Sequence, residues 1–329
     1  MQDLTQGERK NVIVTGGAGF IGSHLCEFLI QRYNVICIDN FSTGSERNID
    51  HLLAHPHFEF LRHDIAEGVD FKSIDAFEKF HVAYTGISQI YHLASPGSPA
   101  WVVAHPIETM MTLALGTRQI LEIARTYDAR LVYVSDLLAS QSMTEELDEV
   151  IRAYANSVHF AEQLCGQYEK LYSVSCSRVR LGSVYGPQMS PDDSHFISSA
   201  ISCALQGKQI QLPNEFDKGA FLYITDAVEA LEKIMQSEEK GDFEVTAGAP
   251  YPIREVIEKI FENIGAPVVD VAQGVWDNQT RMWALQSAQG NIEKLKDDTG
   301  WFPVVVLNDG LAKTIAFMDA QRHLKTMTH

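Results

Sequence analysis

The hydrophobic pattern of the chain begins with a short apolar run at residues 11–15, which is followed by a glycine-rich loop. Leu25, Phe28 and Leu29 then recur at the spacing of one helix face, so this region predicts a strand, a loop and a helix in that order. Further apolar runs of strand length occupy residues 35–39, 58–62, 89–93 and 131–134. Strands that alternate with helical segments predict an α/β fold built on a parallel sheet.

The loop from Gly16 to Gly22 has the glycine spacing of a dinucleotide-binding loop. Gly16 suits a tight turn, Gly19 leaves the backbone bare enough for a pyrophosphate to approach, and Gly22 allows the helix to pack closely on the strand. The second strand ends in Asp39, at the ~20-residue distance expected for a carboxylate that binds the adenosine ribose. Asp39 would also repel a 2′-phosphate, so the pattern favours NAD over NADP. The alternative is an ordinary strand-helix-strand unit whose glycines only turn the chain.

Two later strands also end in residues that we expect at the cofactor. The third strand leads to Asp64 and Ile65, and the fourth ends at Leu93 and leads to Ala94 and Ser95. Parallel strands present their carboxyl ends at one crevice, which is where a dinucleotide binds. Asp64 therefore either holds the edge of the adenine or caps the next helix, and the sequence leaves both interpretations open.

Composition narrows the range of partners. The chain has 329 residues and a formal net charge of -17, so its field repels nucleic acid and anionic membranes and leaves small molecules or proteins. The five cysteines are odd in number and form no Cys-x-x-Cys pair, so we predict neither a disulfide framework nor a metal site. No leader-like apolar core and no apolar stretch approaching ~18 residues is present, and we therefore expect a cytoplasmic protein without membrane contact.

Six segments carry a resemblance to a known family: VIVTGGAGFIGSHL, IDNFSTGSERNI, FLRHDI, YHLASPGSP, VYGPQMSPDD and TGWFPVVVLNDGL. They resemble the extended short-chain dehydrogenases/reductases of the NAD-dependent epimerase/dehydratase family, and most closely the UDP-glucuronate decarboxylases. The resemblance implies a Rossmann-type doubly wound parallel sheet over residues 1–180, to which later segments return, and a smaller C-terminal α/β substrate domain over residues 181–329. It also implies a homodimer formed through two helices per subunit, for which residues 107–127 and 154–171 are candidates.

The resemblance further implies which residues surround NAD. In this family NAD abstracts a hydride from a sugar, and a tyrosine assists as the base. The predicted contacts of NAD are Gly16, Gly19, Phe20, Ile21, Gly22, Asp39, Asn40, Ser42, Thr43, Gly44, Asp64, Ile65, Leu93, Ala94, Ser95 and Tyr154.

The catalytic tyrosine of the family corresponds to Tyr154, and Val158 stands where the family has a lysine one helical turn later. A free phenol titrates near ~10, so only ~0.1% is ionised at neutral pH, which is a deficit of roughly 4 kcal/mol. A neighbouring ammonium closes much of that gap, whereas the isopropyl group of a valine does not. His159 is a poor substitute, because neighbouring helix residues point ~100° apart. Tyr154 is therefore not expected to be an ordinary lysine-activated base.

The strand at residues 131–134 runs into Ser135 and Asp136, where family members carry a hydroxyl residue that binds the reacting oxygen. Matching the strands places Asp136 at the hydroxyl position and Leu138 at an acidic one. A slip of one residue would give the hydroxyl role to Ser135, and the sequence leaves this register open. The catalytic candidates are therefore Tyr154, Asp136 and Ser135.

The substrate side departs from the UDP-glucuronate decarboxylases as well. Ser183 replaces their asparagine, Leu212 replaces a tyrosine that would pack on a base, and Gly219 replaces the arginine of a bidentate anion clamp. We therefore expect a substrate other than UDP-glucuronate. Its candidate contacts are Ser98, Ser183, Tyr185, His195 and Arg281. His195 could bind an anion only when it is protonated, and Arg281 either faces a phosphate or is a surface residue.

Three functions fit these observations. The first is an enzyme of altered chemistry, in which NAD stays bound and Tyr154 acts with Asp136 or Ser135 in an elimination, decarboxylation or isomerisation. The second is a non-catalytic NAD-binding scaffold or sensor, in which Tyr154 is a structural residue. The third is a nucleotide-sugar decarboxylase, epimerase or dehydratase. The retained tyrosine and the carboxylate at the hydroxyl position favour the first.

Overall fold

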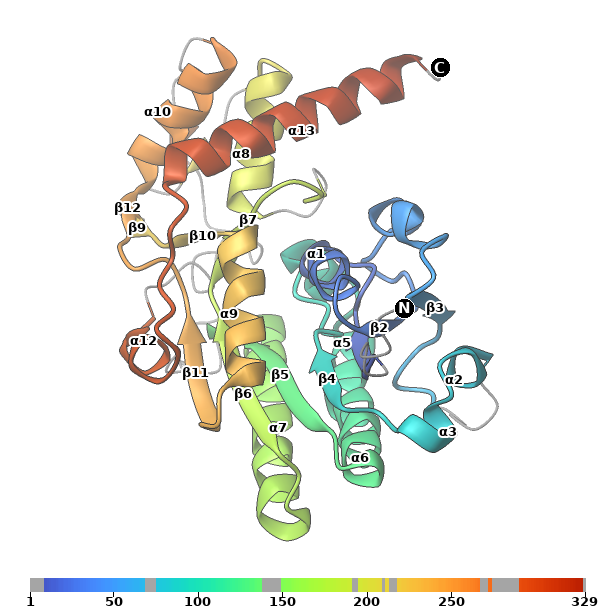
Figure 1. Cartoon of the computed structure of the whole chain (residues 1–329). Coiled ribbons are helices and arrows are strands. Elements are labelled where there is room, and N and C mark those ends of the chain that lie inside the picture. The colour runs from blue at the N-terminus through green and yellow to red at the C-terminus, as the bar shows by residue number, and fades with distance from the viewer. Residues whose placement is uncertain are drawn as a thin grey trace.

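The computed structural model describes residues 9–68, 75–137, 149–190, 195–208, 211–212, 218–266, 272–273 and 290–327. Its main sheet has seven strands, which are β1 (Asn11–Thr15), β2 (Asn34–Asp39), β3 (Phe58–Arg62), β4 (Gln89–His92), β5 (Arg130–Asp136), β6 (Cys176–Leu181) and β11 (Gly241–Val245). All neighbours in the order β11-β6-β5-β4-β1-β2-β3 pair in parallel (Figure 1). The predicted α/β fold on a parallel sheet is confirmed.

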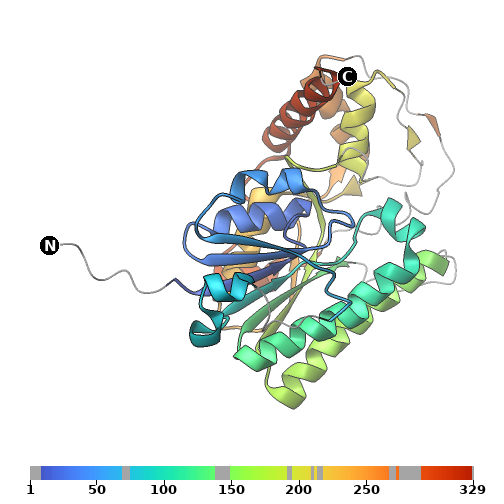
Figure 2. The ribbon, with the colours of Figure 1, turned by 90° about the vertical axis from the view of Figure 1, so that its right-hand side faces the viewer.

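Helices cover both faces of this sheet (Figure 2). They include α1 (Phe20–Leu29), α6 (Thr117–Tyr127), α7 (Glu149–Tyr172) and α9 (Ile224–Gln236). Side chains of the strands alternate between the faces, so that Val132 belongs to the core shared with α1 and α9, whereas Leu131 belongs to the core shared with α6 and α7. This two-sided burial explains why the strands have nearly continuous apolar sequences and confirms the doubly wound arrangement.

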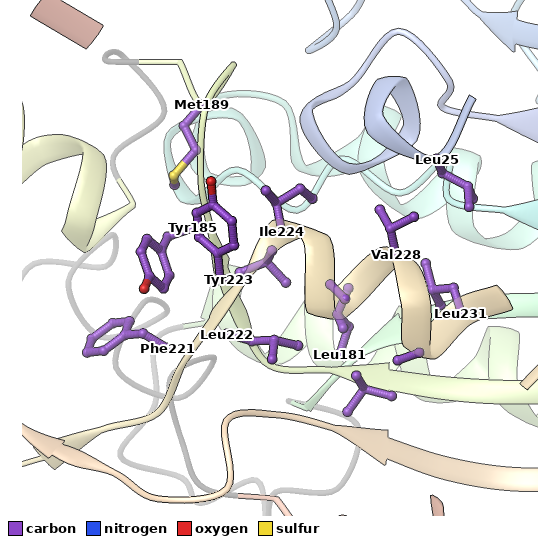
Figure 3. Packing of buried hydrophobic residues seen from close by; sticks show 14 of the residues in the cluster. Leu25, Leu181, Tyr185, Met189, Phe221, Leu222, Tyr223, Ile224, Val228 and Leu231 are labelled. Carbon is purple, nitrogen blue, oxygen red and sulfur yellow. The ribbon is translucent and has the colours of Figure 1, made fainter. Parts of the chain in front are cut away.

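A smaller group of elements lies beyond the carboxyl edge of the sheet, in the upper part of Figure 1. Its strand pairs are β7 (Ser183–Tyr185) with β10 (Phe221–Tyr223), β9 (Lys218–Gly219) with β12 (Tyr251–Pro252), and β8 (Gln211–Leu212) with β13 (Ala272–Gln273). Its helices are α8 (Phe196–Leu205), α10 (Ile253–Ile264) and α13 (Leu307–Met327). Tyr185 and Tyr223 pack edge to face in its core, near Ile224 at the start of α9 (Figure 3). One hydrophobic core therefore joins this group to the sheet.

The chain passes between the two parts more than once. After β7, helix α9 and strand β11 return to the main sheet, where β11 pairs with β6. The buried Asp226 of α9 then fastens the segment before α13, because its Oδ2 accepts hydrogen bonds from the backbone N–H groups of Val304 (3.0 Å) and Val305 (2.9 Å). The return of later segments to the sheet is thus visible, while the division near residue 180 stays a prediction.

The other elements are short and lie around the sheet. They are η1 (Glu46–Asn48), η2 (Asp50–Leu52), α2 (Asp75–Lys79), α3 (Val82–Thr85), α4 (Pro99–Ala104), α5 (Pro106–Met111), the π-helix η4 (Thr112–Gly116) and α12 (Glu293–Thr299). Among all helices in the described ranges, none has the combined length and apolar content that a membrane span requires.

Candidate active site and cofactor pocket

A pocket opens at the carboxyl edge of the sheet, where β1 to β5 end. All of the predicted cofactor residues line this pocket except Gly44, which instead packs against Ala18 and Asp39. Its lining also includes residues that the sequence did not single out, namely Ile38, His63, Pro96, Gly97, Thr112, Val134, Leu181, Gly182 and Val184. The topology therefore brings the predicted cofactor side together at one edge.

The glycine loop has the shape that a dinucleotide needs. Gly16 has a φ of +69°, and a Cβ there would lie only 2.8 Å from the carbonyl carbon of Leu93. A Cβ on Gly22 would overlap the carbonyl oxygen of Gly16, whereas one on Gly19 would meet only that oxygen, at 3.1 Å. The neighbouring backbone thus excludes side chains at Gly16 and Gly22, and the first residues of α1 line the pocket, where the N-terminus of a helix favours an anion. These residues fit the pyrophosphate of NAD.

Asp39 joins the glycine loop to the loop that follows β2. Its Oδ2 accepts a hydrogen bond from the N–H of Ala18 (3.0 Å), and its Oδ1 accepts one from the N–H of Phe41 (2.8 Å). Burial raises the pKa of the Asp39 carboxyl, and these backbone donors oppose that rise. The carboxylate thus shapes the pocket where the ribose is expected, and its contact with ribose stays a prediction.

Asp64 does not cap a helix, because the residues that follow it, 65–67, form a turn. Its Oδ1 accepts a hydrogen bond from the N–H of Ala66 (2.8 Å), and its Oδ2 accepts one from the side-chain amide of Asn40 (2.9 Å). Asp64 also lines the pocket, so these bonds hold it at the cofactor edge. A contact with adenine is compatible with this position and stays a prediction.

At the other end of the pocket, Tyr154 of α7 meets Asp136 at the end of β5. The phenol oxygen lies 3.5 Å from Oδ2 of Asp136, and the tyrosine is almost fully buried. Burial raises the pKa of Tyr154 well above its ordinary value, the negative charge of Asp136 raises it further, and a hydrogen bond with Ser95 opposes the rise. Tyr154 is therefore a neutral phenol at neutral pH, and it is suited to donating a hydrogen bond.

The Ser135 side chain contacts a buried ion pair instead of Tyr154. Its hydroxyl donates a hydrogen bond to Oε1 of the buried Glu162 (2.5 Å), and Arg180 holds the same carboxylate with two bonds of 2.9 and 2.7 Å. Of the two register alternatives, Asp136 contacts Tyr154, whereas the Ser135 side chain fastens α7 to the sheet. Successive residues of a strand point to opposite faces, which explains the difference.

Val158 belongs to a buried apolar cluster together with Val102, Leu113 and Ile151. These residues come from α4, η4 and the first turns of α7, so the cluster forms an apolar wall next to Tyr154. An ammonium at position 158 would be taken out of water among hydrocarbon side chains, at a high desolvation cost. His159 is exposed, which agrees with the expectation that it does not replace the missing lysine.

The substrate candidates separate into three groups. Ser98, Ser183 and His195 line the pocket. Tyr185 does not line it, because its ring is in the core and its hydroxyl donates a hydrogen bond to the carbonyl of Leu307 (3.2 Å). Arg281 lies outside the described residues, as do Leu138 and the side chain of Leu212.

Gly219, which the resemblance places at the arginine clamp, packs closely against two apolar side chains. An added Cβ at Gly219 would lie 2.8 Å from Cζ of Phe221 and 3.1 Å from Cδ1 of Ile253, so a larger residue would require these side chains to move. Gly219 also does not line the pocket.

Two of the nine lining residues that the sequence did not single out show why they were missed. Thr112 reaches the pocket from the π-helix η4, and a single π-turn leaves no recognisable spacing in a sequence. Gly97 lies close to Tyr154, because a Cβ added at Gly97 would be 3.8 Å from the phenol oxygen. Because Ser95 was already expected at the cofactor, the sequence could have suggested that Gly97, two residues later, also lines the pocket.

Known proteins resemble the chain over nearly its whole length. Residues 12–246 match the profile of the NAD dependent epimerase/dehydratase family. UDP-glucuronic acid decarboxylase 6 of Arabidopsis thaliana is 31% identical over 316 residues, which are 91% of this chain and 86% of that protein. UDP-glucuronic acid decarboxylase 1 of Xenopus tropicalis is 30% identical over 329 residues, which cover 95% of this chain and 73% of that protein. The structure of UDP-glucose 4-epimerase from Thermus thermophilus in complex with NAD superposes with a TM-score of 0.74 at 26% identity, covering 94% of this chain and 99% of that one.

We predict that Arg180→Met lowers the free energy of unfolding by about 3 kcal/mol, because it leaves the buried carboxylate of Glu162 without its ion pair. Urea unfolding at neutral pH measures this loss. Arg32→Met is the matched control, since Arg32 is 52% exposed in its pair with Glu232 and its removal should cost less than about 1 kcal/mol. Equal losses in the two variants would contradict the structural role of the Glu162 network.

Proposed function

Because the chain belongs to the NAD dependent epimerase/dehydratase family, we propose that it is an NAD-dependent enzyme that uses Tyr154 with Asp136 on a substrate other than UDP-glucuronate. The contact between the Tyr154 hydroxyl and the Asp136 carboxylate carries this proposal, because it places an acid-base pair at the reacting end of a retained cofactor pocket. NAD is the cofactor of this family, and when it is bound it can accept a hydride from the substrate.

The proposed chemistry divides two roles between two residues. Tyr154, a neutral phenol, donates a hydrogen bond to a developing oxyanion of the substrate, which requires no lysine. Asp136 Oδ2, 3.5 Å away, takes or returns the proton of the reacting group. The apolar wall around Val158 lowers the local polarity and so strengthens both interactions. Elimination, decarboxylation or isomerisation suits this pair better than rapid hydride transfer.

The substrate side supports a change of substrate. In the relatives' family the Gly219 position carries an arginine, and here Phe221 and Ile253 fill that space. The polar groups that line this end of the pocket are hydroxyl, imidazole and carboxylate groups, including those of Ser98, Ser183 and His195. We therefore propose a small molecule, such as a nucleotide sugar, that lacks the glucuronate carboxylate.

A non-catalytic NAD-binding scaffold or sensor is the second candidate. The apolar environment of Val158 favours it, since the same cluster includes Tyr154 as one of its buried members. The two candidates differ in whether Tyr154 and Asp136 contact a substrate that is turned over.

The experiment incubates the NAD-loaded protein with UDP-glucuronate, UDP-glucose and dTDP-glucose, and follows NADH absorbance and the mass of each product. We expect no UDP-xylose and no transient NADH from UDP-glucuronate, because the lysine and the arginine clamp are missing. Turnover of UDP-glucuronate on the scale of seconds would contradict the proposal. Mass spectrometry of the small molecule that copurifies in the pocket extends the panel to the natural ligand.

On whichever substrate is turned over, Tyr154→Phe and Asp136→Asn should each abolish activity, and Asp136→Asn should leave NAD affinity unchanged. Tyr168→Phe is the matched control on the same helix, because its hydroxyl bonds Glu122 (2.6 Å) away from the pocket. Full activity in both site variants would show that the pair is not the catalytic one. A failure of the wild-type protein to turn over any member of the extended panel would favour the scaffold.

We further propose that two copies of the chain associate through α5, η4 and α7. These elements pack side by side along one flank of the molecule (Figure 2). They expose Ile107 (68%), Met110, Met111, Leu115 and Phe160 (52%). An apolar surface of this kind on neighbouring helices is typical of an isologous dimer interface.

Phe160→Glu should therefore convert a dimer into a monomer, which light scattering after size-exclusion chromatography measures. Tyr84→Glu, at an exposed tyrosine of α3, is the control and should leave the mass unchanged. A wild-type protein that is monomeric at micromolar concentration would overturn this interface.

A further inference from the structure

His92 is fully buried at the carboxyl end of β4, and both of its ring nitrogens have partners. Nδ1 lies 2.7 Å from the hydroxyl of Thr15, and Nε2 lies 3.1 Å from the hydroxyl of Thr117. Burial lowers the pKa of His92 to about 3, so the ring is neutral at physiological pH. A neutral imidazole has one donor and one acceptor, which is what a bridge between two hydroxyl groups requires.

Two of the bridged residues directly precede segments that line the cofactor pocket, and the third follows a helix that reaches it. Thr15 directly precedes Gly16 of the glycine loop, and His92 directly precedes Leu93. Thr117 begins α6 immediately after the π-helix η4, which contributes Thr112 to the pocket. One side chain therefore links the ends of β1 and β4 to the helix that starts beside them.

The Thr15 hydroxyl connects this bridge to the turn after β4. The N–H of Ala94 donates a hydrogen bond to that hydroxyl (3.4 Å), which also contacts Nδ1 of His92. In a neutral ring one nitrogen donates and the other accepts, so either tautomer bonds both threonine hydroxyls. The contacts therefore run from Ala94 through Thr15 and His92 to Thr117.

We propose that His92 is a positioning residue for NAD, which holds the glycine loop and the turn after β4 at the separation that the dinucleotide requires. Contact between these two segments is already tight, since a Cβ at Gly16 would lie 2.8 Å from the Leu93 carbonyl carbon. A small shift of either strand end therefore changes both walls at once. The proposal concerns binding of NAD and is independent of the reaction proposed for Tyr154 and Asp136.

The test measures NAD affinity by calorimetry in the full-length protein, together with the melting temperature without NAD. His92→Phe removes both bonds and should raise the Kd for NAD about tenfold, which corresponds to about 1.4 kcal/mol. Thr117→Val removes only one bond without changing the size of the side chain and should raise the Kd about threefold. Tyr91→Phe is the control on the same strand, because the Tyr91 hydroxyl has no hydrogen-bond partner in the described part of the chain. It should leave the Kd unchanged.

Nitrogen NMR of the wild-type protein at neutral pH tests the bridge without any substitution. We expect His92 to be a neutral ring with a single proton, held on one of its two nitrogens. A charged ring would overturn the proposal. So would a Thr117→Val variant that melts at a lower temperature but binds NAD within the error of the wild-type Kd, because His92 would then be a structural residue only. These results do not depend on whether Tyr154 and Asp136 have the catalytic roles proposed above.

Discussion

The pocket depends on the close approach of the backbone at the ends of β1 and β4. Gly16 meets the Leu93 carbonyl at a distance that excludes a side chain, and Gly22 packs against Gly16 itself. Because β1 lies between β2 and β4, this contact fixes the position of β1 relative to the strands on both sides of the crevice. Asp39 lies at the end of β2, on one side of β1, and Ser95 comes after β4, on the other side. The glycine packing therefore determines where both ends of the cofactor would lie.

The two ends of the pocket have opposite electrostatic character. Backbone N–H groups and polar loops form the cofactor end, as an anionic pyrophosphate requires. At the reacting end Tyr154 and Val158 lie in one buried apolar cluster, and Asp136 adds negative charge. Both features act against a tyrosinate, which agrees with the raised pKa of Tyr154. The surroundings of the phenol therefore favour its neutral form.

The sequence predicted the bounds of β1 and β3 to the residue, because each is a run of strand length bounded by polar or turn residues. It could not predict the opposite directions of Ser135 and Asp136, since the partner of Ser135 is Glu162, far along the chain on another element. Tyr185 carried a substrate role by resemblance alone, and tertiary packing directs its hydroxyl to a backbone carbonyl instead. Thr112 was missed because it enters the pocket from a π-turn. Local patterns therefore predict strands and loops, whereas side-chain partners depend on the assembled fold.

The central claim is that Tyr154 stays a neutral phenol beside Asp136 in a retained NAD pocket. The most direct test titrates the tyrosinate absorbance of the NAD-bound wild-type protein against that of Tyr154→Phe, from neutral pH upward. The account predicts no difference between the two proteins below the ordinary phenol pKa of ~10. A difference that develops near neutral pH would show an activated tyrosinate and would contradict the account.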